Sequence, residues 1–152
     1  MLSAGLIALI PLLPIFCFVL IALVGKNAFP KLCGALGTLS ILGSFVLSVI
    51  VAFQYFAVVG KVNGVYQQLT PIKFEWLQFS QNVSIDMGIL LDPISVMMIL
   101  IVTFISLMVH IYSLGYMKGE ERYATYYSFL ALFTFSMLGL VLSSNIFQIY
   151  IF

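Results

Sequence analysis

A single histidine, His110, is the residue of this chain best suited to acid-base chemistry, because an imidazole exchanges a proton near neutral pH. It lies inside a long apolar stretch, where an ionisable residue is a functional candidate by default. At about 100° per residue, a helix through this stretch carries a polar stripe along one face. The stripe consists of Ser95, Thr103, Ser106, His110 and Ser113.

Two interpretations of this stripe are open. Its hydroxyls could join neighbouring helices through hydrogen bonds, which are modest in lipid. Alternatively, it could line a hydrated path, with His110, Ser106 and Thr103 as the candidate proton-path residues. Counting about 1.5 Å per residue from Asp92, His110 lies about 27 Å along the helix, close to the inner membrane boundary. That depth favours proton uptake near the surface over a relay at the membrane centre.

Asp92 begins the same helix. In the run Asp92-Pro93-Ile94-Ser95, a carboxylate that can accept orphan amides is followed by a proline at the first helical position. This pattern predicts a helix cap. The alternative is an outward-facing carboxylate in a proton path, although the sequence places no second ionisable group beside it.

The composition requires a lipid environment. The chain has 152 residues, of which 63% are hydrophobic and 7% charged, with a mean hydropathy of +1.20, so a soluble domain could not bury its apolar surface. Six basic and five acidic residues nearly cancel, which argues against a nucleic-acid partner. Cys17 and Cys33 fit neither a disulfide framework nor a metal motif, and we expect them to pack in the interior.

Motifs for redox or covalent chemistry are missing from the sequence. It contains no Gly-rich phosphate loop, no Cys cluster for iron and sulfur, no haem-type His pair and no nucleophile with a base. We therefore assign no catalytic, cofactor-binding or metal-binding residue. No Lys, Asp or Glu falls near the centre of an apolar stretch, so this chain alone is not expected to pump.

The apolar stretches predict an all-α membrane protein with four complete transmembrane helices and the start of a fifth. The predicted spans are Ser3 to Val24, Cys33 to Val59, Asp92 to Tyr112 and Tyr123 to Leu142, with the fifth beginning near Asn145. Because the last stretch reaches Phe152 without a polar flank, we expect a truncated single membrane domain over 1–152. Its parts are the first two helices (1–60), an extracytoplasmic hairpin (61–91) and the start of a further unit (92–152).

The link between the second and third helices has a sequence pattern typical of strands. Apolar and polar residues alternate from Ile72 to Phe79 and again from Val83 to Ile89, on either side of a turn at Ser80-Gln81-Asn82. This predicts an outward-facing amphipathic β-hairpin on the membrane surface. Lys26 and Lys31 flank the first connector without any acid, which places that connector on the cytoplasmic side.

Two further faces have structural interpretations. Gly37, Ser40, Ser44 and Ser48 form a small-residue face on the second helix, which predicts close helix packing. Tyrosines flank the third connector, as an interfacial belt would. They are Tyr112, Tyr116, Tyr123, Tyr126 and Tyr127.

The stretch from Leu91 to Phe152 resembles the antiporter-like L subunit, the mitochondrial subunit-5 type, of respiratory complex I, the proton-pumping NADH:quinone oxidoreductase. The amino-terminal part fits more loosely, through Leu9-Ile10-Pro11-Leu12-Leu13-Pro14. The motifs that carry the resemblance are Leu91-Asp92-Pro93-Ile94-Ser95, Val109-His110-Ile111-Tyr112-Ser113 with Gly115-Tyr116-Met117, Phe135-Ser136-Met137-Leu138, Ser144-Asn145 and Gln148-Ile149-Tyr150-Ile151-Phe152.

The resemblance implies a membrane-arm subunit that couples electron transfer from NADH to quinone with proton transport. NAD, FMN, iron-sulfur clusters and quinone would then be bound by other subunits, and the partners would be other membrane-arm subunits and the lipid bilayer. In that family a Trp-Glu pair is expected next, with the glutamate in helix five paired to a lysine in helix seven, and His110 matches a histidine at the inner end of helix three. The implied location is a bacterial plasma membrane, with the mitochondrial inner membrane as the alternative.

Three other classes remain open at this point. The large subunit of multisubunit sodium/proton antiporters shares the opening at Asp92 and the Tyr112 to Met117 signature, but often lacks the histidine. Membrane subunits of energy-conserving hydrogenases resemble the same region. A membrane anchor or assembly protein without transport activity is also compatible with the composition.

Overall fold

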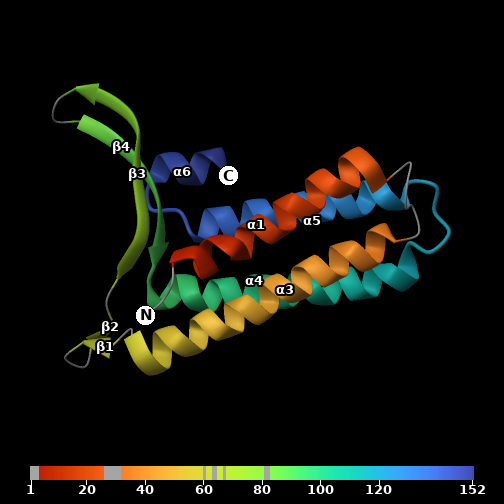
Figure 1. Cartoon of the computed structure of the whole chain (residues 1–152), viewed down its shortest axis with the longest axis horizontal. Coiled ribbons are helices and arrows are strands. Elements are labelled where there is room, and N and C mark those ends of the chain that lie inside the picture. The colour runs from red at the N-terminus through yellow and green to blue at the C-terminus, as the bar shows by residue number, and fades with distance from the viewer. Residues whose placement is uncertain (1–3, 26–31, 60, 63–64, 67, 81–82) are drawn as a thin grey trace.

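A computed structural model describes residues 4–25, 32–59, 61–62, 65–66, 68–80 and 83–152 of the chain (Figure 1). Its long helices are α1 (Ala4–Leu20), α3 (Cys33–Gln54), α4 (Pro93–Tyr116) and α5 (Tyr123–Val141), followed by the short α6 (Ile146–Ile151). Single π-helical turns η1 (Ile21–Gly25) and η2 (Tyr55–Val59) continue α1 and α3. The strands are β1 (Lys61–Val62), β2 (Val65–Tyr66), β3 (Leu69–Ser80) and β4 (Val83–Leu91).

The long helices form an antiparallel bundle. Helices α1 and α4 each pack against both α3 and α5, and α3 also contacts α5 across the bundle (Figure 1). The sheet strands and α6 lie at one end, which we call the hairpin end. The connector 117–122 between α4 and α5 lies at the opposite end, which we call the connector end.

The prediction of four membrane-spanning helices is confirmed at the level of length and composition. Within the described residues, four helical segments are long and apolar enough to cross a bilayer: Ala4–Leu23, Cys33–Val58, Pro93–Tyr116 and Tyr123–Val141. Their outward faces carry large apolar side chains, such as Phe16, Leu39 and Phe53, each more than three-fifths exposed. Lipid would cover this surface. Ser3, the predicted start of the first span, lies outside the described residues, as do the connector lysines Lys26 and Lys31.

Helix α4 is longer than predicted. It continues to Tyr116 instead of ending at Tyr112, so it carries one more turn at the connector end. The turn that follows includes Gly119, whose φ of +99° is a left-handed conformation that glycine adopts without steric cost. His110 therefore lies six residues, about 9 Å, inside the end of its helix, deeper than the sequence indicated.

The predicted hairpin is present and longer than expected. Strand β3 pairs antiparallel with β4, with Phe74 opposite Met87 and Glu75 opposite Asp86, and the pairing is interrupted by three register shifts. The strands reach back to Leu69 and on to Leu91, beyond the alternating pattern seen in the sequence. Gln81 and Asn82 of the predicted turn lie outside the described residues. The small pair β1 and β2 was not predicted.

Helix α1 is joined to α3 by serine hydroxyls. The Oγ of Ser44 donates a hydrogen bond to the carbonyl of Ile10 at 2.9 Å. In an α-helix that carbonyl would accept from residue 14, but Pro14 has no N–H. Ser44 thus supplies the donor that the proline cannot, in the lipid-embedded part of the bundle where a bare carbonyl is costly. The small-residue face of α3 is confirmed as a packing surface.

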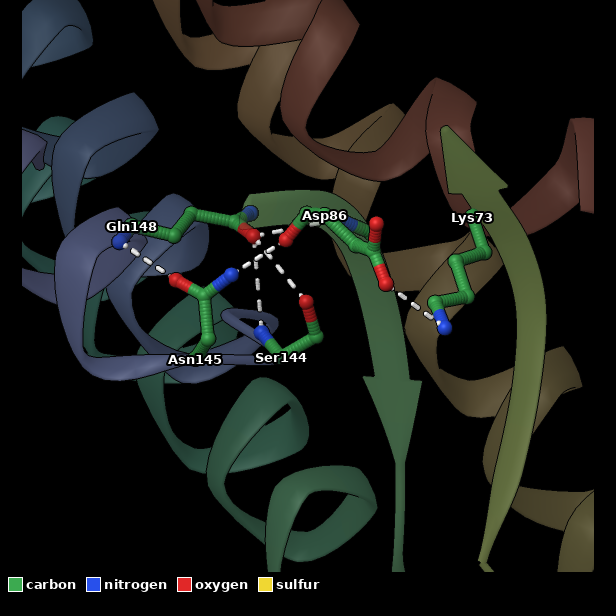
Figure 2. A network of polar contacts seen from close by, with 6 residues as sticks. Lys73, Asp86, Ser144, Asn145 and Gln148 are labelled. Atoms are coloured by element: carbon green, nitrogen blue, oxygen red, sulfur yellow. Dashed lines mark hydrogen bonds and ion pairs between the residues drawn. The ribbon is translucent and has the colours of Figure 1, made fainter. Parts of the chain in front are cut away.

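At the hairpin end, β4 is fastened to the start of α6 (Figure 2). The Gln148 side-chain oxygen accepts hydrogen bonds from the Gly88 amide at 3.2 Å and the Ser144 hydroxyl at 3.3 Å. The Asn145 side-chain amide donates to the carbonyl of Asp86, while its Oδ1 accepts from the Gln148 amide at 2.8 Å and so caps α6. The beginning of α6 is therefore positioned by the hairpin as well as by α5.

Backbone contacts strengthen this junction. The amide of Leu90 donates to the carbonyl of Leu142 at 3.0 Å, and Ile89 forms an antiparallel bridge with Ser143. Gly88 is required here because a Cβ at this position would lie 2.6 Å from the carbonyl oxygen of Ile72. The chain that leaves α5 thus acts as a short third strand beside β4.

A salt bridge joins the two hairpin strands near this junction. The ammonium of Lys73 lies 2.7 Å from Oδ2 of Asp86 (Figure 2). The hydrogen bond and charge of Asp86 raise the pKa of Lys73 above its ordinary value, so this pair persists across the physiological range. Because the lysine is well exposed, we assign the pair a role in orienting the strands and little net stability.

Replacing Ser44 with alanine should lower the free energy of unfolding by about 1 kcal/mol, because the Ile10 carbonyl loses its donor in a lipid environment. The matched control is Ser40→Ala. Ser40 donates to the carbonyl of Leu13 at 2.9 Å, but that carbonyl also faces the amide of residue 17, which is not a proline. Reversible unfolding in bilayer discs measures both variants, and equal losses would contradict this account of Pro14.

Replacing Gln148 with alanine should speed hydrogen exchange of the Gly88 amide by roughly fivefold to tenfold, because that amide loses its acceptor. The Leu90 amide, which donates to the Leu142 carbonyl, should change less. Gln54→Ala is the matched control, since its Oε1 has no hydrogen-bond partner among the described residues. Amide exchange followed by NMR tests this, and unchanged exchange at Gly88 would show that the side chain does not hold the hairpin.

Candidate functional site

The polar stripe of α4 faces the interior of the bundle. Thr103 and His110 are fully buried, Ser113 is 2% exposed, and Ser106 is half-buried. Its predicted position on one helix face is therefore confirmed. Buried polar groups in this setting need hydrogen-bond partners, so the partners show what the stripe can do.

His110 has one satisfied and one unsatisfied ring nitrogen. Its Nδ1 lies 2.7 Å from the carbonyl oxygen of Ser106. A carbonyl only accepts, so we assign the hydrogen of the neutral ring to Nδ1. Nε2 then carries the lone pair, and it is buried without a hydrogen-bond partner among the described residues. The free lone pair makes Nε2 the atom that can take up a proton.

Helix α5 provides partners that the sequence interpretation missed. The hydroxyl of Tyr126 lies 2.9 Å from that of Ser113, and Thr134 donates to Ser106 at 3.3 Å. The Tyr127 hydroxyl donates to the backbone carbonyl of His110 at 3.1 Å. Tyr127 and Thr134 are seven residues apart and so share one helix face. That spacing was the available signal.

The tyrosines of the predicted belt differ in exposure. Tyr112 and Tyr116 are about 70% exposed and stack on each other on the outside of α4. Tyr127, by contrast, is fully buried, with its ring centroid 5.8 Å from that of His110. It packs inside because α5 turns this face toward α3 and α4. Tyr127 therefore supports the histidine from inside the bundle.

The side chains alone do not form a continuous hydrogen-bonded chain along α4. Thr103 donates to the carbonyl of Ile99 at 2.8 Å, and Ser113 to that of Val109 at 2.7 Å, both within their own helix. Contacts between helices occur at Ser106 and Ser113, on either side of His110. Both interpretations therefore have support: some hydroxyls join helices, and the histidine keeps a free acceptor.

Asp92 lies at the other end of α4. Its Oδ1 accepts the amide of Ser95 at 2.6 Å, and Pro93 occupies the first helical position. The predicted helix cap is confirmed. Eighteen residues, about 27 Å of helix, separate Asp92 from His110, so the two do not share a site.

Cys17 and Cys33 are both buried, as the packing prediction requires. They lie in an apolar cluster with Ile21, Ala124 and Tyr127. Across the described parts of the chain, no three His, Cys, Asp or Glu side chains come together in a group that could hold a metal ion. The chemistry this site can perform is proton binding at one imidazole.

Asp92→Ala should destabilise the start of α4 by about 1 kcal/mol, because the Ser95 amide loses its acceptor. Asp92→Asn keeps an acceptor oxygen without the charge and should retain most of that stability. Thermal unfolding in lipid measures the difference. If the asparagine variant were as unstable as the alanine variant, the charge of Asp92 would matter more than its cap.

Comparison with known proteins gives a consistent result. The family model for "NADH-Ubiquinone oxidoreductase (complex I), chain 5 N-terminus" matches residues 76–127. The chain is 35% identical over 153 residues to NAD(P)H-quinone oxidoreductase subunit 5, chloroplastic, of Chara vulgaris, covering 99% of this chain and 22% of the relative. It is 38% identical over 114 residues to NADH-quinone oxidoreductase subunit L of Neisseria meningitidis serogroup A, covering 74% and 16%.

The same type of subunit from Chaetosphaeridium globosum is 37% identical over 149 residues, covering 95% of this chain and 21% of that protein. The chain thus spans about a fifth of the length of the curated relatives it matches. The matching stretch includes Asp92, the polar stripe and His110. By sequence, this chain is similar to the subunit 5 and subunit L proteins of complex I, and its residues 76–127 match the amino-terminal model of that family.

Proposed function

We propose that this chain is the amino-terminal part of a membrane-arm subunit of a proton-translocating NADH:quinone oxidoreductase. The observation that carries the proposal is similarity along 99% of the chain to a protein named NAD(P)H-quinone oxidoreductase subunit 5. The four apolar helices fit a membrane-arm position. In this role the chain belongs to an enzyme complex, while NAD, FMN, iron-sulfur clusters and quinone are bound by other subunits.

Its partners in this proposal are the other membrane-arm subunits and the lipid bilayer. The lipid-facing side chains of α1, α3 and α4 support the second of these. The relative from Neisseria supports a bacterial plasma membrane, whereas the chloroplastic relatives support an organelle membrane as the alternative. In either case the proposed membrane is one that holds a proton gradient.

We further propose that the connector end faces the side from which protons are taken. Lys118 and Arg122 lie in the connector after α4, and Lys26 and Lys31 lie in the sequence between α1 and α3. The connector between α1 and α3 contains no acidic residue, so its lysines favour the cytoplasmic side, whereas the connector after α4 also contains Glu120 and Glu121. The hairpin end, with β3 and β4, then faces outward.

In this orientation His110 is a proton-binding group about 9 Å inside the proton-uptake surface. Its Nε2 receives the proton, and the Ser106 carbonyl holds the ring through Nδ1. Ser106 and Thr103 lie deeper along the same face and line the proposed path.

Replacing His110 with alanine in the full-length subunit should lower the number of protons translocated per NADH while leaving assembly intact. The expected cause is loss of the group that takes up the proton at the inner end of α4. The measurement is proton translocation per NADH oxidised in sealed vesicles, with assembly checked by native electrophoresis.

Tyr112→Phe is the matched control, because Tyr112 is two residues away on α4 and 69% exposed. It should leave the proton yield at the level of the unmodified complex. An unchanged yield in the His110→Ala complex, with normal assembly, would refute the assigned role of His110.

A further inference from the structure

The buried Nε2 of His110 needs a hydrogen-bond partner. The ring is fully buried, and leaving a buried acceptor without a hydrogen bond is unfavourable. No described side chain or backbone group forms a hydrogen bond with this atom. We propose that Nε2 binds an internal water molecule between α3, α4 and α5, and that this water is the immediate proton donor to His110.

Neighbouring hydroxyls are already engaged. Tyr127, the aromatic residue closest to the ring, donates its hydrogen to the backbone carbonyl of His110. The Ser113 hydroxyl donates to the carbonyl of Val109 and forms a second hydrogen bond with the hydroxyl of Tyr126. Immobilising a water carries an entropic cost, which its hydrogen bond to the otherwise unpaired nitrogen can offset.

Gly37 of α3 packs closely against the ring. A Cβ built at this position would lie 3.6 Å from Cδ2 of His110, the carbon bonded to Nε2, and 3.0 Å from Cδ1 of Tyr127. Glycine therefore keeps a side chain away from the edge of the imidazole that carries the free lone pair. This edge faces α3, opposite the nitrogen held by Ser106.

The chemistry of the site favours water over other ligands. One imidazole nitrogen is a single ligand, and in the described residues no group of three metal-binding side chains occurs to add to it. A water molecule can donate a hydrogen bond to the lone pair of Nε2, and it can also transfer a proton to it. When the proton moves, one O–H bond of the donor breaks, one N–H bond forms at Nε2, and the electron pair of the broken bond stays on oxygen. A proton from the connector-end solvent adds to the same oxygen as this proton leaves, so the water is regenerated and no hydroxide is formed.

The site can be tested directly because His110 is the only histidine of the chain. The full chain, labelled with 15N-histidine and reconstituted in lipid bilayers, gives ring-nitrogen signals that need no further assignment. Solid-state NMR near neutral pH should show hydrogen on Nδ1, a bare Nε2, and magnetisation transfer from water to Nε2.

Gly37→Ala should reduce that transfer by about half or more while keeping hydrogen on Nδ1, because the added methyl narrows the space beside the ring. Gly115→Ala is the matched control on α4, where a Cβ would meet nothing within 4 Å, and it should match the unmodified chain.

Three results would overturn the proposal. They are hydrogen on Nε2 in the neutral ring, no transfer from water to the ring while connector amides such as that of Glu120 exchange, or equal transfer in both glycine variants. The assigned role as proton donor depends on the proposed function, but the binding of water does not. A dry Nε2 with normal proton yield in the Tyr112→Phe control and loss in His110→Ala would reject only the water site.

Discussion

The absence of water in the hydrocarbon is the constraint on which the rest of this structure depends. Each buried N–H and C=O must find its partner within the protein. Helices satisfy nearly all of them, and the exceptions explain the contacts between helices. Pro14 removes one donor from α1, and Ser44 of α3 replaces it. The Thr103 hydroxyl returns its hydrogen to a carbonyl of its own helix, so this side chain remains buried without holding a neighbouring helix.

At the hairpin end the same requirement is met by a sheet edge. A two-stranded hairpin has exposed backbone groups on both edges, and β4 satisfies part of its edge with the chain that leaves α5. Gln148 and Asn145 add side-chain amides, which donate and accept at once and therefore suit a junction between a strand and a helix start (Figure 2). Consequently α6 takes its position from residues about 60 positions earlier in the chain.

Local periodicity accounts for what the sequence predicted well. The apolar stretches gave the long helices to within one turn, the Asp92-Pro93 pair gave the start of α4, and alternation gave β3 and β4. The missed features depend on contacts between distant segments. Nothing near Gln148 in an otherwise apolar run indicates that its partner is Gly88, and the inward position of Tyr127 follows from how α5 rotates against α3. The extra turn of α4 was missed because Ser113, Gly115 and Tyr116 resemble a polar membrane boundary, although they continue the helix.

Within the described residues, two buried side-chain atoms lack a partner: Oε1 of Gln54 near the hairpin end and Nε2 of His110 nearer the connector end. They differ in chemistry. A carboxamide oxygen is a weak base that does not bind a proton in the physiological range, so at Gln54 a missing donor concerns packing alone. An imidazole nitrogen with a fixed tautomer is a base that changes charge in that range. Of these two atoms, only Nε2 of His110 can therefore turn an unsatisfied hydrogen bond into proton uptake, and it lies nearer the end of the bundle that we propose to face the uptake side.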